Sequence, residues 1–288
     1  MSQPDPVHPL QETFARIAQR SEFIRPRLGR PAGGEGWIVP ADLFAPQSPS
    51  LAALIRATQR RVRTEAPTVT GGVLIQEYQW PLLATAVACF LVDRRVPDLR
   101  PENVQLRLPP EESEGEAREQ GEQIAFLRGC FVALPDDLAA GRPDALLVPD
   151  LDALRAALRT GIETHMAFVI DKISEAVGCK PKGLWLFVTD YLASMLSWIM
   201  QKQGQSACLT CIEQEAHALI GGAQSPLNKK KVSFFALTYQ GHTHVFLDRA
   251  SCCYWYKMEG GAYCSTCPHR TKQDRNERLL KHLAEEYA

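Results

Sequence analysis

The chain lacks an excess of charge of either sign. It has 32 Lys and Arg residues against 33 Asp and Glu residues, which gives a formal net charge of −1. Domains that bind nucleic acid or anionic membrane surfaces through electrostatics are usually strongly basic. The composition therefore gives no electrostatic reason to expect either partner, and we predict that the chain binds no nucleic acid.

The sequence also lacks a recognisable targeting or membrane-spanning segment. Residues 1–10 have neither a basic start nor an apolar run, so they do not resemble a signal peptide. The most apolar stretches are residues 81–92 and 184–200. The first is too short to cross a bilayer, and the second contains Asp190 in an amphipathic context. We expect a soluble cytoplasmic protein without stable membrane insertion.

Common nucleotide and hydrolase motifs are missing as well. The run Gly33-Gly34-x-Gly36 lacks the Lys-Ser/Thr of a phosphate-binding loop, and no convincing strand precedes it. We find no dinucleotide fingerprint and no serine-hydrolase elbow. If the protein carries out redox chemistry, its electrons must therefore come from another protein.

Cysteine, in contrast, is abundant and clustered. Four of the nine cysteines form a Cys-Cys-x10-Cys-x2-Cys motif near the C-terminus, at Cys252, Cys253, Cys264 and Cys267. In a reducing compartment such cysteines are not expected to form disulfides, so their clustering indicates metal or redox chemistry. Four thiols joined by a short Gly-containing loop can hold zinc, copper(I) or an iron–sulfur cluster.

The adjacent pair favours an iron–sulfur cluster over zinc. Structural zinc sites usually combine two separated Cys-x2–4-Cys turns. Neighbouring side chains diverge in extended chain, so Cys252 and Cys253 can face one metal only if the backbone bends sharply. A [2Fe–2S] cluster, held by four thiolates, is wider than a single ion. We expect Cys252 and Cys253 on one iron and Cys264 and Cys267 on the other, while zinc remains open.

A second Cys-x-x-Cys pair, Cys208 and Cys211, complicates this picture. Both residues fall within a predicted helix over 206–220, one turn apart, and we expect them to be buried there. A two-turn zinc site with the second half of the C-terminal motif, or a redox role, remains an alternative. The three isolated cysteines are predicted to be small buried residues: Cys89, Cys130 and Cys179.

Periodicity predicts a mixed N-terminal half. Residues 1–50 are rich in Pro and Gly and are predicted to form an extended arm with one short helix near 11–21. The following segments are predicted, in order, to be a helix at 51–63, a strand at 73–80, a helix at 81–92, and strands at 103–108 and 125–134. The acidic stretch 109–123 is interpreted as a solvated loop.

The C-terminal half is predicted to be mainly helical. Apolar residues at three-to-four spacing predict helices over 150–177, 184–203 and 206–220. Alternation over 232–239 and 244–248 predicts a β-hairpin that leads directly into the cysteine motif, and a charged helix follows at 271–287.

These elements predict an α+β fold. The N-terminal half has helices and a small antiparallel sheet, and the helical C-terminal half ends in the hairpin and the four-cysteine loop. We predict an N-terminal arm at 1–50, an α+β subdomain at 51–147 and a helical subdomain at 148–288, with the cluster-binding segment at 249–268.

The motif closely resembles the C-terminal motif of FhuF-like ferric-siderophore reductases. The resemblance includes the four cysteines, Pro268 after the last one, a preceding Arg249 and an intervening Tyr256, Gly261 and Tyr263. In that family the four cysteines ligate a [2Fe–2S] cluster, which implies the same cofactor here. Weaker similarity in layout extends from about residue 71 to 268. The charged helix after Pro268 and the Cys208–Cys211 pair lie outside the pattern.

The resemblance implies one-electron reduction of Fe(III) held by an imported siderophore, with a ferredoxin or a flavin-dependent reductase as electron donor. A hydroxamate-type siderophore is the expected substrate. Residues near the cluster are expected to contact it: Arg249, Trp255, Tyr256, Lys257, Tyr263 and Arg270.

Three other functions remain open. A zinc-stapled siderophore-binding or adaptor module would share the cysteines but contain no sulfide. A pure electron-transfer protein would hold the cluster without reacting with ferric chelates. The siderophore synthetases, distantly similar in their C-terminal part, need an ATP site that we do not find in this sequence.

Overall fold

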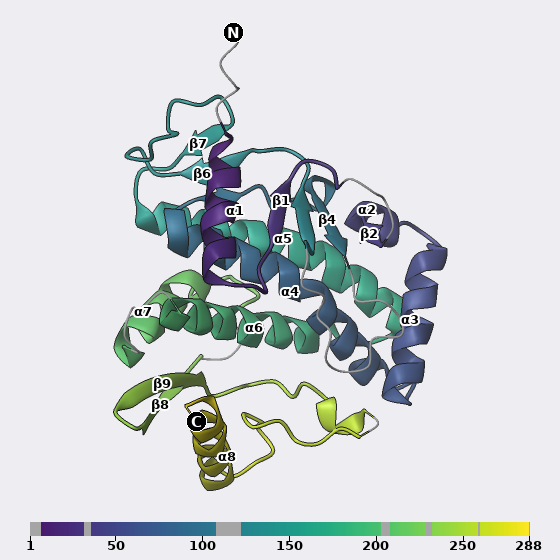
Figure 1. Ribbon diagram of the computed structural model, residues 1–288. Coiled ribbons are helices and arrows are strands. Elements are labelled where there is room, and N and C mark those ends of the chain that lie inside the picture. The colour runs from purple at the N-terminus through teal and green to yellow at the C-terminus, as the bar shows by residue number, and fades with distance from the viewer. Residues whose placement is uncertain are drawn as a thin grey trace. The chain divides into compact units, whose positions relative to one another are not determined.

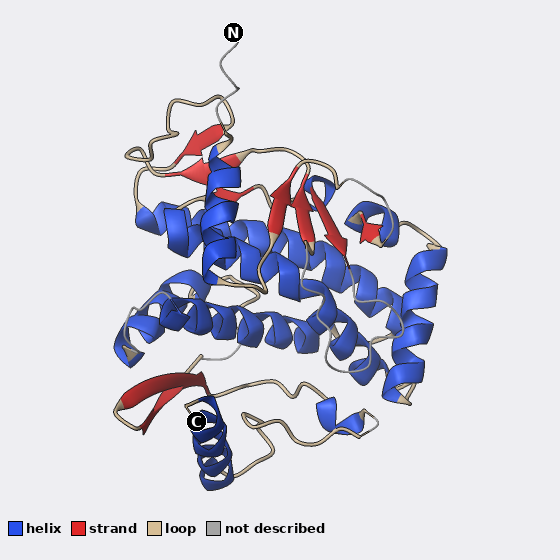
Figure 2. Ribbon diagram, in the orientation of Figure 1, coloured by secondary structure: helices blue, strands red, loops and turns tan. Residues whose placement is uncertain are grey.

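The computed structural model describes residues 7–31, 36–107, 122–202, 208–228, 232–258 and 260–287. It confirms the α+β class, with small sheets in the N-terminal half and helices followed by a hairpin in the C-terminal half (Figure 1, Figure 2). The chain forms two compact units, each built from two stretches. Unit 1 comprises Met1–Ala45 and Pro81–His165, and unit 2 comprises Pro46–Trp80 and Met166–Ala288.

Unit 1 contains two small mixed sheets instead of one antiparallel sheet. The first has the order β1 (Pro26–Leu28), β5 (Ile124–Phe126), β4 (Val104–Arg107), β2 (Trp37–Ile38), in which β1 and β5 are parallel. The second has the order β3 (Val96–Pro97), β6 (Phe131–Ala133), β7 (Ala145–Leu147), in which β6 and β7 are parallel. The strands that the sequence predicts in one antiparallel sheet therefore belong to two separate sheets.

The strand predicted at 125–134 is divided between these sheets. A bend separates β5 from β6, and the side chain of Asn103 holds it. Its amide oxygen accepts the Arg128 backbone N–H at 2.8 Å, and its amide nitrogen donates to the carbonyl of Asp98 at 2.9 Å. Asn103 lies at the end of the short 3-10 helix η1 (Pro101–Asn103). The predicted loop at 109–123 lies largely outside the described residues.

The short helix predicted near 11–21 is confirmed, but the described residues of the predicted arm also contribute strands and a second helix. Helix α1 (Pro9–Arg20) begins with a capping box between His8 and Gln11 and buries Leu10, Phe14 and Ile17. Strands β1 and β2 then join the first sheet, and α2 (Pro40–Leu43) follows. Prolines at helix starts and strand edges are compatible with packed structure, so the composition of this segment was misleading.

Helix α4 (Pro67–Asp93) corrects a second prediction. The segment predicted as a strand at 73–80 and the helix at 81–92 form one continuous helix with Pro81 inside it. Most of its residues from Val69 to Phe90 are buried. A helix that is apolar all round has no helical stripe, so periodicity could not distinguish it from a strand. The helix α3 (Pro49–Val62) precedes it, capped by Ser48.

The three predicted helices of the C-terminal half are confirmed as α5 (Leu151–Val177), α6 (Pro181–Lys202) and α7 (Leu209–Ile220). Within the described part of the chain, α6 is the one helix long and apolar enough to cross a membrane. However, 67% of its most apolar window is buried inside the structure. A mostly buried core helix meets the same criterion, so this is weak evidence for a membrane span.

The predicted hairpin is also confirmed, as β8 (Phe234–Tyr239) and β9 (His242–Leu247), joined by Gln240 and Gly241. Both turn residues have positive φ, as two-residue hairpin turns of type I′ require. In Figure 1, α6 lies along β9 on one side of the hairpin, and α8 (Lys272–Glu286) lies beside β8. The end of β9 is thereby fixed where the chain enters the cysteine motif.

The predicted division at residues 50 and 147 stays a prediction. The two compact units describe how residues pack together, and they say nothing of which segments fold independently.

Candidate iron–sulfur site

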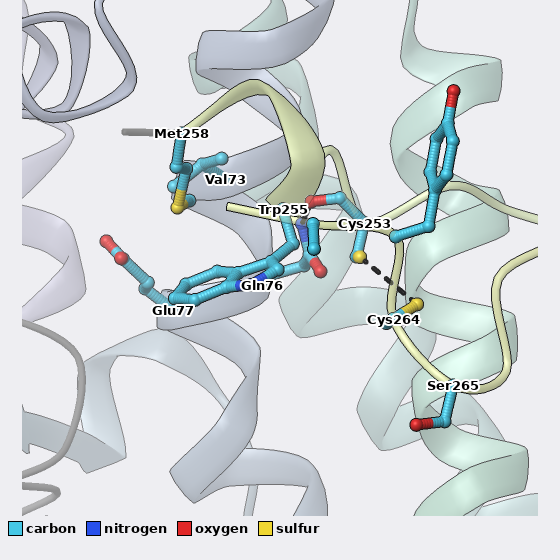
Figure 3. Close-up of a pocket in the computed structure, with 10 residues that line it drawn as sticks. Val73, Gln76, Glu77, Cys253, Trp255, Met258, Cys264 and Ser265 are labelled. Atoms are coloured by element: carbon cyan, nitrogen blue, oxygen red, sulfur yellow. Dashed lines mark hydrogen bonds between the residues drawn. The ribbon is translucent and has the colours of Figure 1, made fainter. Parts of the chain in front are cut away.

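The chain between β9 and α8 carries the four motif cysteines. Cys252 and Cys253 lie just before the 3-10 helix η2 (Trp255–Lys257), and Cys264 and Cys267 lie in the turn that follows it. The Sγ atoms of Cys253 and Cys264 are 3.7 Å apart (Figure 3). The Cys267 backbone N–H donates to the Cys264 carbonyl at 3.1 Å, which closes the Cys-x-x-Cys turn. Cys267 is buried and the other three cysteines are half-buried.

The contact between Cys253 and Cys264 shifts the pKa values of the two thiols in opposite directions. The hydrogen bond between the two thiols is the main cause that lowers the pKa of Cys253, to about 5, against the effect of burial. The Trp255 backbone N–H and the Arg249 guanidinium support this shift. The pKa of Cys264 is raised for the converse reason, and burial adds to it. Because metal ligands must be deprotonated, Cys253 is the first of this pair ready to bind.

Arg249 is placed between a carboxylate and a sulfur. Its Nη1 atom lies 4.0 Å from the Sγ of Cys264, and its Nε atom lies 4.0 Å from Oδ2 of Asp190. Hydrogen bonds and charge near a cluster sulfur stabilise the more negative state of the cluster. Arg249 therefore lies where it can tune the electron affinity of a bound cluster.

Asp190 on α6 anchors the segment that leads into the motif. Only 3% of its surface is exposed. Its carboxylate accepts hydrogen bonds from the backbone N–H of Ala250 at 3.2 Å, and from the N–H and the hydroxyl of Ser251, both at 2.6 Å. A buried carboxylate is stable only when it is well hydrogen-bonded. Asp190 therefore fixes the backbone directly before Cys252.

On the other side of the cysteine pair, Tyr254 makes the sharp bend that two adjacent ligands require. Its backbone is left-handed, with φ of 57°. Its ring packs against Phe187 of α6, with ring centroids 5.9 Å apart. Both rings also pack against Gly72 of α4. A Cβ at this position would lie 3.0 Å from a ring carbon of Tyr254 and 3.0 Å from a ring carbon of Phe187. Gly72 therefore leaves the space into which Tyr254 turns.

Helix α4 also holds the pair through a hydrogen bond and an apolar cluster. The Gln76 side-chain amide donates to the Cys253 carbonyl at 3.2 Å. Tyr254 and Met258 pack against a buried cluster made of Val62, Val69 and Val73. The loop is thus supported on its apolar side by Val69 and Val73 of the helix that supplies the hydrogen bond, together with Val62 at the end of α3.

The separation of Cys253 and Cys264 fits two thiolates that share one tetrahedral metal, as in a [2Fe–2S] cluster or a zinc site. Two thiolates on one tetrahedral metal, with metal–sulfur bonds of about 2.3 Å, lie about 3.8 Å apart, close to the Cys253–Cys264 separation. Within the described ranges, no group of three or more His, Cys, Asp or Glu side chains is arranged to hold a single ion. The Cys253–Cys264 separation would let these two thiolates share one metal, while the predicted assignment of Cys252 and Cys253 to one iron and Cys264 and Cys267 to the other stays a prediction.

A cavity of about 530 Å³ lies against this pair. Its lining is mostly apolar and aromatic, and it comes from α4 and the cysteine loop: Val73, Gln76, Glu77, Cys253, Trp255, Met258, Ala262, Tyr263, Cys264 and Ser265. In Figure 3 the indole of Trp255 extends from the loop alongside Gln76 and Glu77. Trp255 is 45% and Tyr263 44% exposed. Two large aromatic side chains thus remain accessible next to the sulfur atoms.

Two of the predicted substrate residues line the cavity, and three others lie in the cysteine loop and the turn after it without being part of the lining. Trp255 and Tyr263 line the cavity. Tyr256 packs on Tyr263, with ring centroids 4.7 Å apart, and the amine of Lys257 lies over the Tyr256 ring. Arg270 donates to the carbonyls of Tyr263 and Cys264, at 2.6 and 3.0 Å. Arg270 therefore holds the loop, while contact of any of these residues with substrate stays a prediction.

Sequence reasoning missed the part of the cavity that comes from α4. Val73, Gln76 and Glu77 are three and four residues apart, so they share one face of a helix. In the strand that we predicted, Gln76 would lie on the opposite face from Val73 and Glu77. A helical interpretation of this segment would have grouped them.

Comparison with known families supports the site. A family model described as the FhuF 2Fe-2S C-terminal domain matches residues 249–269. Comparison with curated proteins gave no significant match. The match confirms the predicted resemblance, and the matched domain binds the predicted cofactor, a [2Fe–2S] cluster. The match covers only this short C-terminal segment.

The first prediction concerns Gly72. A G72A substitution should force the Tyr254 and Phe187 rings apart, because the new Cβ would lie within 3.0–3.1 Å of their carbons. We expect a loss of about 1–3 kcal/mol of stability, as for other overpacked sites, together with less iron per purified chain. Thermal unfolding and iron analysis measure both effects.

The matched control is Gly183 in the first turn of α6, where nothing lies within 4 Å of the added Cβ. G183A should be neutral or stabilising by up to about 1 kcal/mol, as expected for Ala in a helix. Equal iron content and equal melting temperatures in G72A and the parent protein would contradict the packing described for Tyr254.

The second prediction concerns Asp190. In D190N one of the two carboxylate oxygens, both of which accept backbone N–H groups, is replaced by an NH2 group that cannot accept a hydrogen bond. Hydrogen bonds to a buried charge contribute about 1.5–3 kcal/mol, so we expect the loop to open more often and a strong iron chelator to remove iron about tenfold faster or more. The measurement is the decay of visible absorbance after chelator is added.

Glu175 on α5 provides the control, because its side chain is 78% exposed and lies outside the site. E175Q should lose iron at the rate of the parent protein. If D190N also does so, Asp190 does not hold the cluster-binding segment.

Proposed function

We propose that the protein is a cytoplasmic ferric-siderophore reductase. The observation that carries this proposal is the open cavity against Cys253 and Cys264, in a segment that matches a [2Fe–2S]-binding domain. A chelate in this cavity would lie next to two of the four thiols that ligate the cluster. A buried cluster that served only structure would not need such access.

The proposed chemistry depends on the preference of oxygen ligands for Fe(III) over Fe(II). Hard oxygen donors such as hydroxamates hold Fe(III) far more tightly than Fe(II), so the addition of one electron labilises the metal and leaves the siderophore intact. When bound, a [2Fe–2S] cluster supplies electrons one at a time at a potential set by its hydrogen bonds and exposure. Trp255 and Tyr263 offer flat apolar surfaces that can bind a chelate and exclude water at that position.

The charge of the cavity favours a weakly charged chelate. Among the described residues that line it, Glu77 is the only side chain with a formal charge besides the cysteines, and it forms an ion pair with Arg61. Four thiolates nearby add negative charge. A neutral or cationic hydroxamate complex therefore suits this site better than a highly anionic chelate, which supports the hydroxamate class.

The electron donor is proposed to be a separate ferredoxin or flavin-dependent reductase. The sequence has no dinucleotide fingerprint, so a donor of either class must bring its own reduced cofactor to the protein.

The third prediction tests this function. Protein reduced under anaerobic conditions should be reoxidised by a ferric hydroxamate chelate, with a ferrous-specific chelator capturing about one Fe(II) per electron released. W255A should raise the chelate concentration that gives half-maximal rate about five- to thirtyfold, as expected for the loss of about 1–2 kcal/mol of aromatic contact. Stopped-flow absorbance against chelate concentration measures both.

The control is F23A, since Phe23 in unit 1 is also 45% exposed and lies outside the cavity. F23A should saturate as the parent protein does. A reduced protein that ferric chelates do not reoxidise would contradict the reductase function, and equal saturation of W255A and F23A would contradict the proposed binding site.

A further inference from the structure

The Cys208–Cys211 pair has a structure that the sequence did not predict. We expected both residues inside a helix and buried. Cys211 does lie within the helix, but Cys208 lies outside it and neither residue is buried. Cys208 precedes α7 as its N-cap, both side chains are exposed, and the two sulfurs form a disulfide. The helix begins at Leu209, so its first turn points the two cysteines to the surface.

The pair is built into the start of a well-anchored helix. The Sγ of Cys208 accepts the backbone N–H of Cys211 at 3.1 Å. The N–H groups of a helical first turn have no partners within the helix and favour negative charge, including a thiolate. The opposite face of α7 is buried through Ile212, Ala216, Leu219 and Ile220. The disulfide therefore lies on a rigid base with its sulfurs accessible.

Neither the four-cysteine motif nor the residues that support it include this pair. The two residues lie outside the matched segment 249–269. Their bond to each other excludes the two-turn zinc site with Cys264 and Cys267 in this state. Cys130, which we predicted to be buried, is an exposed free cysteine, so it serves as a reference for the reactivity that exposure alone gives a thiol.

We propose that Cys208 and Cys211 form a thiol–disulfide exchange site, which takes a partner thiol either from a dithiol protein or from a small molecule. The partner thiolate attacks the Sγ of Cys208, and Cys211 leaves as a thiolate that takes up a proton. A second partner thiolate then attacks the partner sulfur of this mixed disulfide, which releases Cys208. Overall, two partner thiols are oxidised to one disulfide, and the protein gains two electrons and two protons as two thiols.

The test equilibrates the cluster-containing protein with mixtures of reduced and oxidised glutathione, and in parallel with a small dithiol protein of the thioredoxin type. Free thiols are then trapped by alkylation after acid quenching and located by peptide mass mapping. We expect Cys208 and Cys211 to change together in one two-electron transition, while Cys130 shows no such paired transition. Comparable rates in both arms identify a small thiol as a competent partner, and reaction only in the second arm identifies a dithiol protein.

Reactivity provides a second readout. In the reduced protein at pH 7, Cys208 should react with iodoacetamide about threefold faster than Cys130 or more, because a helix N-terminus increases the thiolate fraction more than it lowers nucleophilicity. C211S should trap glutathione on Cys208 as a stable mixed disulfide. The double variant C208S/C211S should lose the transition and keep the iron content of the parent protein.

Two results would overturn the proposal. One is a pair that stays fully oxidised in excess dithiothreitol or fully reduced in excess oxidised glutathione. The other is zinc that copurifies in stoichiometric amount and is lost in C208S/C211S, which would make the pair a metal site.

Discussion

Two adjacent cysteines can serve one metal cluster only if the backbone between them and the next residue turns sharply and is held there. In this protein the turn is made at Tyr254, whose left-handed backbone would be unfavourable without support. Asp190 fixes the chain before the pair, and Gly72 leaves space for the Tyr254 ring after it. The cluster site therefore depends on helices α4 and α6, far from the motif in sequence.

The same supports explain why the site is open on one side. Apolar contacts of Tyr254 and Met258 with a valine cluster close the loop against α4, and Asp190 closes it against α6. Trp255 and Tyr263 are then left exposed beside Cys253 and Cys264, where they border the cavity. An anchored loop with accessible aromatic side chains is compatible with the proposed reduction of a bulky ferric chelate.

Much of this could be predicted from the sequence, because the cysteine chemistry is local. The four-cysteine motif indicated a metal site, its resemblance to a known family implied the cofactor, and periodicity predicted helices α5, α6 and α7 and the hairpin. The first half of α4 was missed because a helix buried on all sides has no apolar stripe. Cys208 was wrongly predicted to be buried because it lies one residue before the helix, as its N-cap. Periodicity defines the ends of a helix less well than its interior. The contacts of Asp190 and Gly72 depend on tertiary packing, which no local pattern encodes.

The most direct test of the central claim is the iron, acid-labile sulfide and zinc content of anaerobically purified protein, with a visible spectrum of the same sample. The account predicts about two irons and two sulfides per chain, as a [2Fe–2S] cluster requires, with thiolate-to-iron charge-transfer bands. Stoichiometric zinc without sulfide would contradict it, and would make the four cysteines a structural staple.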